Sequence, residues 1–266
     1  MTTDNQFKKR LAENCETLRS LHAGSALLVL PNAWDAASAR IFETAGFPAI
    51  ATTSGGVAAS VGFEDHENAP ADEMFAAAAR ITAAVSVPVT VDLEAGYGLS
   101  PEEFVERAIT AGAAGFNLED SNHGGPAKMV PAEQQAERLA AVKAAGRRAG
   151  VDFVINARVD PLLHREGTLQ EQLVETIRRG KLYREAGADC LYPFGFFDEA
   201  TVAALVEGLG GPINILSMRN TISLTRLAEL GVTRVTFGTS LFRQFMTHVT
   251  ETAAEIRANL PPQSTT

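Results

Sequence analysis

Two carboxylates, Asp92 and Glu94, follow the apolar stretch Val87–Val91 and could bind a cation. Valine at every second position of the stretch predicts a buried β-strand, whose period of two would turn both carboxylates the same way. Two carboxylates that lie side by side repel each other unless a proton or a cation lies between them. Gly96 and Gly98 come next and allow the backbone to turn tightly beside a ligand. The stretch therefore predicts a cation site at a strand end, with two solvated acids as the alternative.

A third acid and an arginine follow the next two predicted strands. Glu119 ends one of these strands, and Arg158 comes directly after the other. Because neighbouring parallel strands end at the same edge, we expect Asp92, Glu94 and Glu119 to converge. Carboxylate oxygens favour a hard cation, so the predicted metal is Mg²⁺, with Mn²⁺ as the alternative. The planar guanidinium of Arg158 suits a substrate carboxylate, although it could instead neutralise the acids.

Polar residues after the second predicted strand indicate an anion-binding turn and a lid. Thr53, Ser54 and Gly55 offer hydroxyl and backbone N–H groups to an anionic oxygen. The connection Gly55–Pro70 is long for a compact α/β protein, and such loops commonly cover a site. It contains Asp65, which would be either a catalytic group or an ordinary solvated acid.

Two further residues have reactive side chains. His123 lies in the loop after the fourth predicted strand and could carry a proton near neutral pH, although a histidine in a surface loop is often idle. Cys190 lies inside an apolar strand, so we expect it to be a core residue and not a nucleophile.

Short apolar strands alternate with amphipathic helices along the chain. Strands are expected at Ala26–Pro31, Ala49–Ser54, Val87–Asp92, Gly115–Glu119, Asp152–Ala157, Asp189–Pro193, Pro212–Ser217 and Arg234–Gly238. Helices are expected at Asp35–Ala45, Ala71–Val85, Pro101–Ala111, Pro131–Ala149, Thr168–Ala186, Asp198–Leu209, Ile222–Leu230 and Leu241–Asn259. This alternation predicts an α/β fold of the (β/α)₈ TIM-barrel type, with a doubly wound open sheet as the competing architecture. Both architectures place ligands at the carboxyl ends of the strands.

Capping signals mark several helix ends. Ser100-Pro-Glu-Glu predicts a capping box with proline at the first helical position. Gly46, Gly112, Gly187 and Gly231 each precede a predicted strand, which is typical of a left-handed helix C-cap.

The composition argues against several classes of protein. With 266 residues, of which 45% are hydrophobic, the chain can bury the core of a single barrel domain, 1–266. A net charge of −9 argues against nucleic acid or an anionic membrane as a partner. The chain has no apolar run long enough to span a membrane and only two distant cysteines, so we expect a cytoplasmic protein. We also expect residues 1–24 to form a helix that caps one barrel end, and residues 260–266 to be disordered.

Three motifs together resemble the isocitrate lyase/phosphoenolpyruvate mutase superfamily. They are Asp92-Leu-Glu-Ala-Gly-Tyr-Gly98, Leu118-Glu-Asp120 and Ala157-Arg-Val-Asp160, and the resemblance runs from about Leu28 to Phe245. It implies a (β/α)₈ barrel that binds Mg²⁺ with an α-keto acid and makes or breaks a C–C or P–C bond beside a pyruvate enolate. It also implies a homo-oligomer, a dimer or a tetramer, in which subunits exchange the C-terminal helix.

The resemblance assigns roles to five positions. Asp92 resembles the principal metal ligand, and Glu94 and Glu119 resemble acids that hold the metal directly or through water. Arg158 resembles the arginine on the substrate carboxylate. Asp65 matches the aspartate of the gating loop that is a nucleophile or an activator in the mutase and hydrolase branches.

Further residues are expected to contact the substrate. The loop that receives the oxygens of the keto acid is matched by Thr53, Ser54 and Gly55. Asn122 and Trp34, which follow the fourth and first strands, complete this set.

The chain departs from the superfamily pattern in two places. Position 94 is glutamate where the mutases have aspartate, so the metal could be held through one more water. The stretch Asp120–Lys128 lacks the Lys-Lys-Cys-Gly-His loop of the lyase branch, which argues against isocitrate or methylisocitrate cleavage by the usual route. Asn122, His123 and Lys128 are the replacements that this stretch offers.

We therefore expect a Mg²⁺-dependent enzyme that cleaves a C–C or P–C bond of a small 2-oxo dicarboxylate or a phosphonopyruvate-like substrate. The expected catalytic residues are Asp65, Arg158 and His123. A metal-dependent pyruvate aldolase and a barrel that binds a keto acid without turnover are the alternatives.

Overall fold

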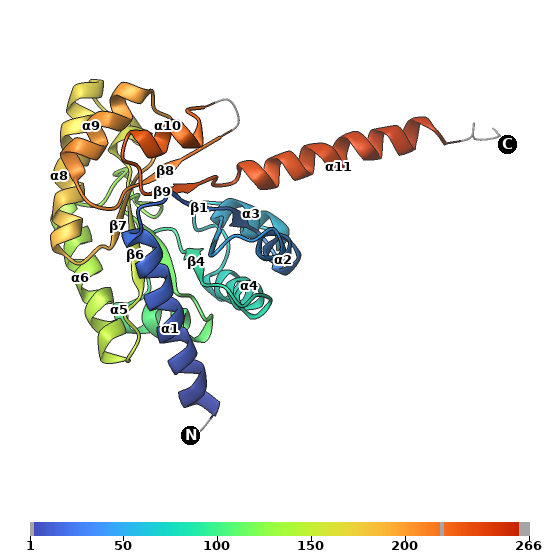
Figure 1. The fold of residues 1–266 in the computed structure, drawn as a ribbon, viewed down its shortest axis with the longest axis horizontal. Coiled ribbons are helices and arrows are strands. Elements are labelled where there is room, and N and C mark those ends of the chain that lie inside the picture. The colour runs from blue at the N-terminus through green and yellow to red at the C-terminus, as the bar shows by residue number, and fades with distance from the viewer. Residues whose placement is uncertain (1–2, 219–220, 261–266) are drawn as a thin grey trace.

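A computed structural model describes residues 3–218 and 221–260 (Figure 1). The strands are β1 (Leu28–Leu30), β2 (Asn32–Ala33), β3 (Ile50–Thr52), β4 (Val89–Asp92), β5 (Gly115–Glu119), β6 (Val154–Val159), β7 (Cys190–Pro193), β8 (Asn214–Leu216) and β9 (Arg234–Thr236). The helices are α1 (Thr3–Ala23), α2 (Ala36–Thr44), α3 (Ser54–Ser60), α4 (Ala71–Ala83), α5 (Pro101–Thr110), α6 (Ala132–Arg148), α7 (Pro161–His164), α8 (Leu169–Glu185), α9 (Glu199–Leu209), α10 (Leu224–Glu229) and α11 (Ser240–Ala258). Of the tail expected to be disordered, residues 261–266 lie outside the described residues.

The strands close into a barrel. Parallel pairing gives the order β2-β3-β4-β5-β6-β7 in one sheet and β1-β9-β8 in the other. A parallel bridge between Leu191 and Ile213 joins β7 to β8. Only Pro31 separates β1 from β2. Proline has no N–H to donate to a neighbouring strand, which interrupts the ladder, but its carbonyl still accepts from Ala51 N at 3.0 Å. The predicted (β/α)₈ barrel is confirmed, and the closed ring excludes the open sheet.

The inner strands are buried on both faces because helices cover the outside of the ring. Every residue of β5 and of β6 is buried, as expected for parallel strands between two packed layers. Phe104 of α5 packs edge-on against Phe116 of β5, with ring centroids 4.8 Å apart. Phe116 in turn packs against Phe153, at 5.3 Å. These rings fix α5 against the strands that carry the predicted acids.

The predicted helix caps are present. Ser100 accepts from Glu103 N and Glu103 caps Ser100 in return, with Pro101 at the first helical position of α5. Gly46, Gly112, Gly187 and Gly231 all have positive φ. The C-cap glycines keep the connections short and so set where the following strands begin.

One boundary prediction was wrong. The second strand was expected to run to Ser54 but ends at Thr52, and the first part of the predicted lid, residues 55–60, belongs to the helix α3. Gly55 and Gly56 had suggested a flexible connection, but neither has positive φ. A Cβ on Gly55 would lie 2.6 Å from Asp65 Oδ2, and one on Gly56 would lie 2.6 Å from Thr53 Cγ2. The glycines are therefore needed for close packing of α3, and only the segment 61–70 is a loop.

Helix α1 closes the amino-terminal end of the barrel, as predicted. Its residues Leu11, Cys15 and Leu18 are buried. Arg19 donates from Nη2 to the carbonyl of Asp152, just before β6, at 2.7 Å. The helix is thus anchored by apolar packing and by a hydrogen bond to the barrel wall.

Helix α11 extends away from the barrel (Figure 1). None of its residues is buried. Within residues 3–218 and 221–260, no helix has both the length and the apolar character needed to cross a membrane.

A histidine and an arginine meet where α1 closes the barrel. His22 and Arg234 are 5% and 0% exposed, and His22 Nε2 lies 3.4 Å from Arg234 Nη1. Burial, followed by the charge of Arg234, lowers the pKa of His22 to about 4. The pair therefore favours neutral histidine in the folded protein.

This pair predicts a loss of stability in mild acid. Between the ordinary pKa of 6.5 and the folded value of about 4, the unfolded chain binds the proton that folded His22 excludes. The free energy of unfolding should therefore decrease as the pH is lowered through this window, by on the order of 3 kcal/mol in total. Denaturant unfolding of His22→Gln should show a shallower pH dependence, whereas His248→Gln, on exposed α11, should behave like the parent. Identical pH profiles for the parent and His22→Gln would contradict this role.

Candidate active site

The acids predicted to bind a metal lie at the carboxyl ends of β4 and β5. Asp92 is the last residue of β4, and Glu119, the last residue of β5, is in register with Arg158 of β6. Glu94 lies two residues beyond Asp92, with a left-handed φ of 49°. A turn, and not strand alternation, therefore brings Glu94 beside Asp92.

Burial makes ionisation of these acids costly. It is the largest cause that raises the pKa of Glu94 to about 8, although the hydroxyl of Tyr97, 2.8 Å away, opposes the shift. Burial likewise raises the pKa of Glu119 to about 7, against the charge of Arg158. The pKa of Asp92 is also raised by burial, and its Oδ1 is buried with no hydrogen-bond partner among the described residues. The three acids are therefore a place where a proton or a cation would be stabilised.

Arg158 contacts one of the three acids, Glu119, and a further carboxylate, that of Asp160. Its Nη1 lies 2.6 Å from Glu119 Oε2, and its Nε donates to Asp160 Oδ1 at 2.8 Å. The guanidinium carbon lies 3.8 Å from the centre of the Phe194 ring. Among the described residues these bonds leave Nη2 for a ligand, so Arg158 both neutralises the acids and retains a donor edge.

The segment 61–70 is folded over the acids as a closed lid. Its Glu67 donates from the backbone N to Glu94 Oε2 at 2.7 Å, and accepts from Tyr97 N at 2.5 Å. The Asp65 carboxylate packs against Gly55, and its Oδ1 is buried without a partner among the described residues. The charge of Asp65 contributes to the raised pKa of Asp92 and of Glu94. The structure thus brings Asp65 to the predicted metal site.

The loop after β5 places His123 on the same acids. His123 Nε2 lies 2.7 Å from Glu119 Oε1, and this hydrogen bond raises the pKa of His123. Asn122 holds the loop through its backbone N, which donates to Lys128 O at 2.8 Å, and its Oδ1, which accepts from Gly124 N. His123 is therefore part of the acid cluster and not an isolated surface histidine.

The remaining predicted substrate contacts lie at the start of α3 and directly after β2. Thr53 Oγ1 is 2.9 Å from Thr239 Oγ1, and Ser54 N donates to Asp92 Oδ2 at 3.3 Å. The Trp34 ring packs against the Phe242 and Phe245 rings of α11, with centroids 5.5 and 5.6 Å away. Trp34 therefore stands where α11 leaves the barrel, and its contact with substrate stays a prediction.

Sequence reasoning missed some of the residues that hold this site. Glu67 and Tyr97 join the lid to the turn after β4, and Asp160 orients Arg158. Asp160 was visible as a polar residue at a strand end, and Tyr97 lies within the Gly-Tyr-Gly turn. Nothing in the sequence signals that Glu67 folds back onto Glu94.

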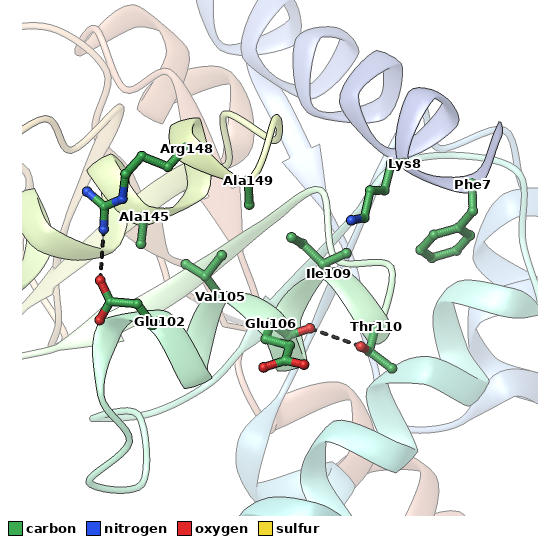
Figure 2. Close-up of a pocket in the computed structure, with 10 residues that line it drawn as sticks. All are labelled: Phe7, Lys8, Glu102, Val105, Glu106, Ile109, Thr110, Ala145, Arg148 and Ala149. Carbon is green, nitrogen blue, oxygen red and sulfur yellow. Dashed lines mark hydrogen bonds and ion pairs between the residues drawn. The ribbon is translucent and has the colours of Figure 1, made fainter. Parts of the chain in front are cut away.

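A large groove elsewhere on the surface is separate from this cluster. It has a volume of about 720 Å³ and lies between α1, α5 and α6, lined by Phe7, Val105 and Ile109 among others (Figure 2). An ion pair between Arg148 and Glu102, 2.8 Å apart, spans its edge (Figure 2). Since it lies on the outer helices, it does not contribute to the site at the strand ends.

Comparison with known proteins gives a consistent result. The family model for phosphoenolpyruvate phosphomutase matches residues 18–257. The chain is 32% identical to 2-methylisocitrate lyase of Escherichia coli strain K12, over 73% of this chain and 63% of that protein. It is 30% identical to oxaloacetate decarboxylase of Bradyrhizobium diazoefficiens, over 74% of this chain and 69% of that protein.

Solved structures agree with these relatives. A protein of Burkholderia cenocepacia J2315 superposes with a TM-score of 0.85 at 39% identity, covering 91% of this chain and 99% of that one. A phosphonopyruvate hydrolase, solved in complex with oxalate and Mg²⁺, superposes with a TM-score of 0.82 at 26% identity, covering 94% of this chain and 92% of that one.

The buried acids predict how the protein responds to Mg²⁺. Asp92→Asn removes one charge from the cluster while keeping the shape of the side chain. The variant should lose the stabilisation by Mg²⁺, which for a ligand at 100 times its Kd amounts to about 2.7 kcal/mol. Without metal, it should be at least as stable as the parent, because Glu94 and Glu119 lose a repulsive neighbour.

Thermal unfolding with and without Mg²⁺ measures both effects. Glu106→Gln, an exposed acid on α5, is the matched control and should respond to Mg²⁺ as the parent does. Equal Mg²⁺-induced shifts in Tm for the parent and Asp92→Asn would remove Asp92 from the metal site.

Proposed function

Since this chain belongs to the phosphoenolpyruvate phosphomutase family, within the isocitrate lyase/phosphoenolpyruvate mutase superfamily, we propose that it cleaves a small 2-oxo acid with the help of Mg²⁺. The bond broken would be the C–C or P–C bond between C3 and its substituent, in a substrate such as oxaloacetate or phosphonopyruvate, and its cleavage would leave the enolate of pyruvate. The observation that carries the proposal is the closed lid, which sets the Asp65 carboxylate against Gly55 and near Asp92 and Glu94.

The donor set fits Mg²⁺. Asp92 offers a buried oxygen, Oδ1, that no described residue satisfies, and Glu94 and Glu119 add carboxylates with raised pKa. Oxygen ligands of this kind suit Mg²⁺, and Mn²⁺ could replace it. When bound, the cation would supply positive charge to the keto and carboxylate oxygens of the substrate. Asp92 would hold it, with Glu94 and Glu119 acting directly or through water.

Arg158 and the turn before α3 would orient the substrate. The Nη2 edge of Arg158 can donate to a substrate carboxylate, while Glu119 and Asp160 keep the guanidinium in place. Thr53, Ser54 and Gly55 lie between Asp92 and the lid, where the oxygens of a keto acid would need donors. These contacts would hold the scissile bond toward Asp65.

Asp65 and His123 are the proton-carrying groups beside the proposed substrate position. Asp65 Oδ1 is buried and has no partner among the described residues, so it is available to the reacting group. His123 is held on Glu119, which favours its protonated form. We propose that Asp65 acts on the group attached to C3 of the substrate, because the closed lid excludes water from that side.

A substrate screen tests the proposal. Oxaloacetate, phosphonopyruvate and other 3- or 4-substituted 2-oxo acids would be incubated with the protein, with Mg²⁺ or with EDTA, and the products identified by NMR. We expect Mg²⁺-dependent consumption of at least one of them. No turnover of any compound, despite Mg²⁺-dependent binding of oxalate, would favour a keto-acid-binding barrel without catalysis.

The assignment of Asp65 makes a kinetic prediction. Asp65→Asn should keep binding of Mg²⁺ and oxalate while slowing turnover by roughly 10²–10⁴, the usual effect of losing a general acid or base. Glu64→Gln, the exposed neighbour on the same lid, should stay within a few-fold of the parent. If Asp65→Asn also stays within a few-fold, Asp65 takes no part in the chemistry and His123 is the next candidate.

We also propose that α11 packs on a second copy of the chain. Val249 and Ile256 of this helix are 41% and 62% exposed, and no residue of the helix is buried. Light scattering after size exclusion should therefore give at least a dimer, which Val249→Glu with Ile256→Glu should dissociate. Ile41→Glu, at an equally exposed site on α2, should leave the assembly intact. A monomeric parent would contradict the proposal.

A further inference from the structure

We infer that the closed lid forms a second cation site from His66, Glu94 and His123, which binds a transition metal such as Zn²⁺ and holds the lid shut. The inference rests on the lid proposed above, and it adds a means by which a metal other than Mg²⁺ would regulate the same site. The three residues come from the lid, from the turn after β4 and from the loop after β5.

The geometry comes close to a metal site. One ligand atom from each of His66, Glu94 and His123 lies within 4.8 Å of the others. In a tetrahedral site with bonds of about 2.0–2.1 Å, ligand atoms are about 3.3 Å apart. The separations exceed this value by about 1.5 Å at most, and the exposed side chain of His66 can rotate toward the other two ligands.

Two of the three ligands are already oriented by other residues. His123 Nε2 lies 2.7 Å from Glu119 Oε1, which leaves Nδ1 as the ring nitrogen available to a metal. Histidine ligands of metals usually donate from the second ring nitrogen to a carboxylate in this way. Glu94 is held by Tyr97 Oη at 2.8 Å and by Glu67 N at 2.7 Å. A carboxylate oxygen has a second lone pair, so these hydrogen bonds do not exclude a metal.

The backbone of the lid has an uncommon conformation at the third ligand, His66. His66 and Glu67 have φ of 67° and 57°, an uncommon conformation for residues other than glycine. The His66 ring lies beside the His123 ring, with centroids 5.4 Å apart. Glu67, next in the chain, makes the hydrogen bonds that tie the lid to Glu94 and Tyr97. The lid is thus fixed with its imidazole beside the other two ligands.

The donor types separate this site from the Mg²⁺ site. Two imidazoles and one carboxylate suit Zn²⁺, Co²⁺ or Ni²⁺, whereas Mg²⁺ prefers oxygen ligands and retains its waters. Asp65, Glu67 and Glu119 surround the cluster with further negative charge, and Arg158 offsets only part of it. His66 is exposed, so a metal from solution could reach it first and then engage buried Glu94.

A metal at this position would join the lid to the barrel. Substrate entry and product release need the lid to open, and opening would then require His66 to leave the metal. Zn²⁺ is therefore expected to slow lid opening and to inhibit the enzyme, while Mg²⁺ at Asp92 is not.

Direct metal binding tests the inference. Metal-free protein would be titrated with Zn²⁺ in competition with a chromophoric chelator, and hydrogen exchange of residues 61–70 would be followed with and without Zn²⁺. We expect Zn²⁺ to bind and to slow exchange in the lid. His66→Gln should weaken Zn²⁺ binding by about tenfold or more and abolish the slowing of exchange.

Two matched variants complete this experiment. His248→Gln, which removes an exposed histidine from α11, should bind Zn²⁺ as the parent does. His66→Cys keeps a metal-binding side chain and should restore both effects. Equal Zn²⁺ affinity for the parent and His66→Gln, or unchanged lid exchange on Zn²⁺ binding, would overturn the inference.

The hypotheses of a Mg²⁺ site and of a Zn²⁺ site can be tested separately. Asp92→Asn should lose the response to Mg²⁺ and keep Zn²⁺ binding with slowed lid exchange, because Asp92 is not a ligand of the second site. Loss of Zn²⁺ binding in Asp92→Asn, with the fold intact by circular dichroism, would mean a single metal site and would overturn the inference. A failed substrate screen would leave the Zn²⁺ result unaffected.

Discussion

The cost of burying several carboxylates together at the ends of β4 and β5 is the constraint on which the site depends. Asp92, Glu94 and Glu119 each have a raised pKa, with burial as its main cause. Arg158 offsets this cost only in part, because its charge lowers the pKa of Asp92 and of Glu119 while burial keeps both pKa values raised. Protons or a cation would stabilise such a cluster.

The barrel makes this arrangement possible by building the acids into rigid elements. Glu119 and Arg158 face each other in the parallel register of β5 and β6, and both strands are entirely buried. The lid is held over these elements by two hydrogen bonds, one from Glu67 N to the Glu94 carboxylate and one from Tyr97 N to the Glu67 carboxylate. In this position the lid adds the charge of Asp65 to the cluster, where it contributes to the raised pKa of Asp92 and of Glu94.

The sequence was sufficient for the barrel and for the residues at strand ends. Strand and helix periods, capping boxes and C-cap glycines are local signals, and polar residues at the ends of β4, β5 and β6 are conspicuous after apolar runs. The rest depended on long-range packing. Gly55 and Gly56 suggested a loop, but they allow α3 to pack against Asp65 and Thr53, and Trp34 packs on α11 because its indole meets Phe242 and Phe245. Nor could the sequence reveal that His66 reaches His123, which depends on how the lid folds.

Formation of a pyruvate enolate is the central chemical claim, and proton exchange measures it without knowledge of the leaving group. Pyruvate in D₂O would be followed by proton NMR with the protein and Mg²⁺, and with the protein and EDTA. Enolate stabilisation predicts that the methyl signal decays with Mg²⁺ and persists with EDTA. A methyl signal that persists in both, at pyruvate concentrations that saturate the Mg²⁺-loaded protein, would contradict the claim.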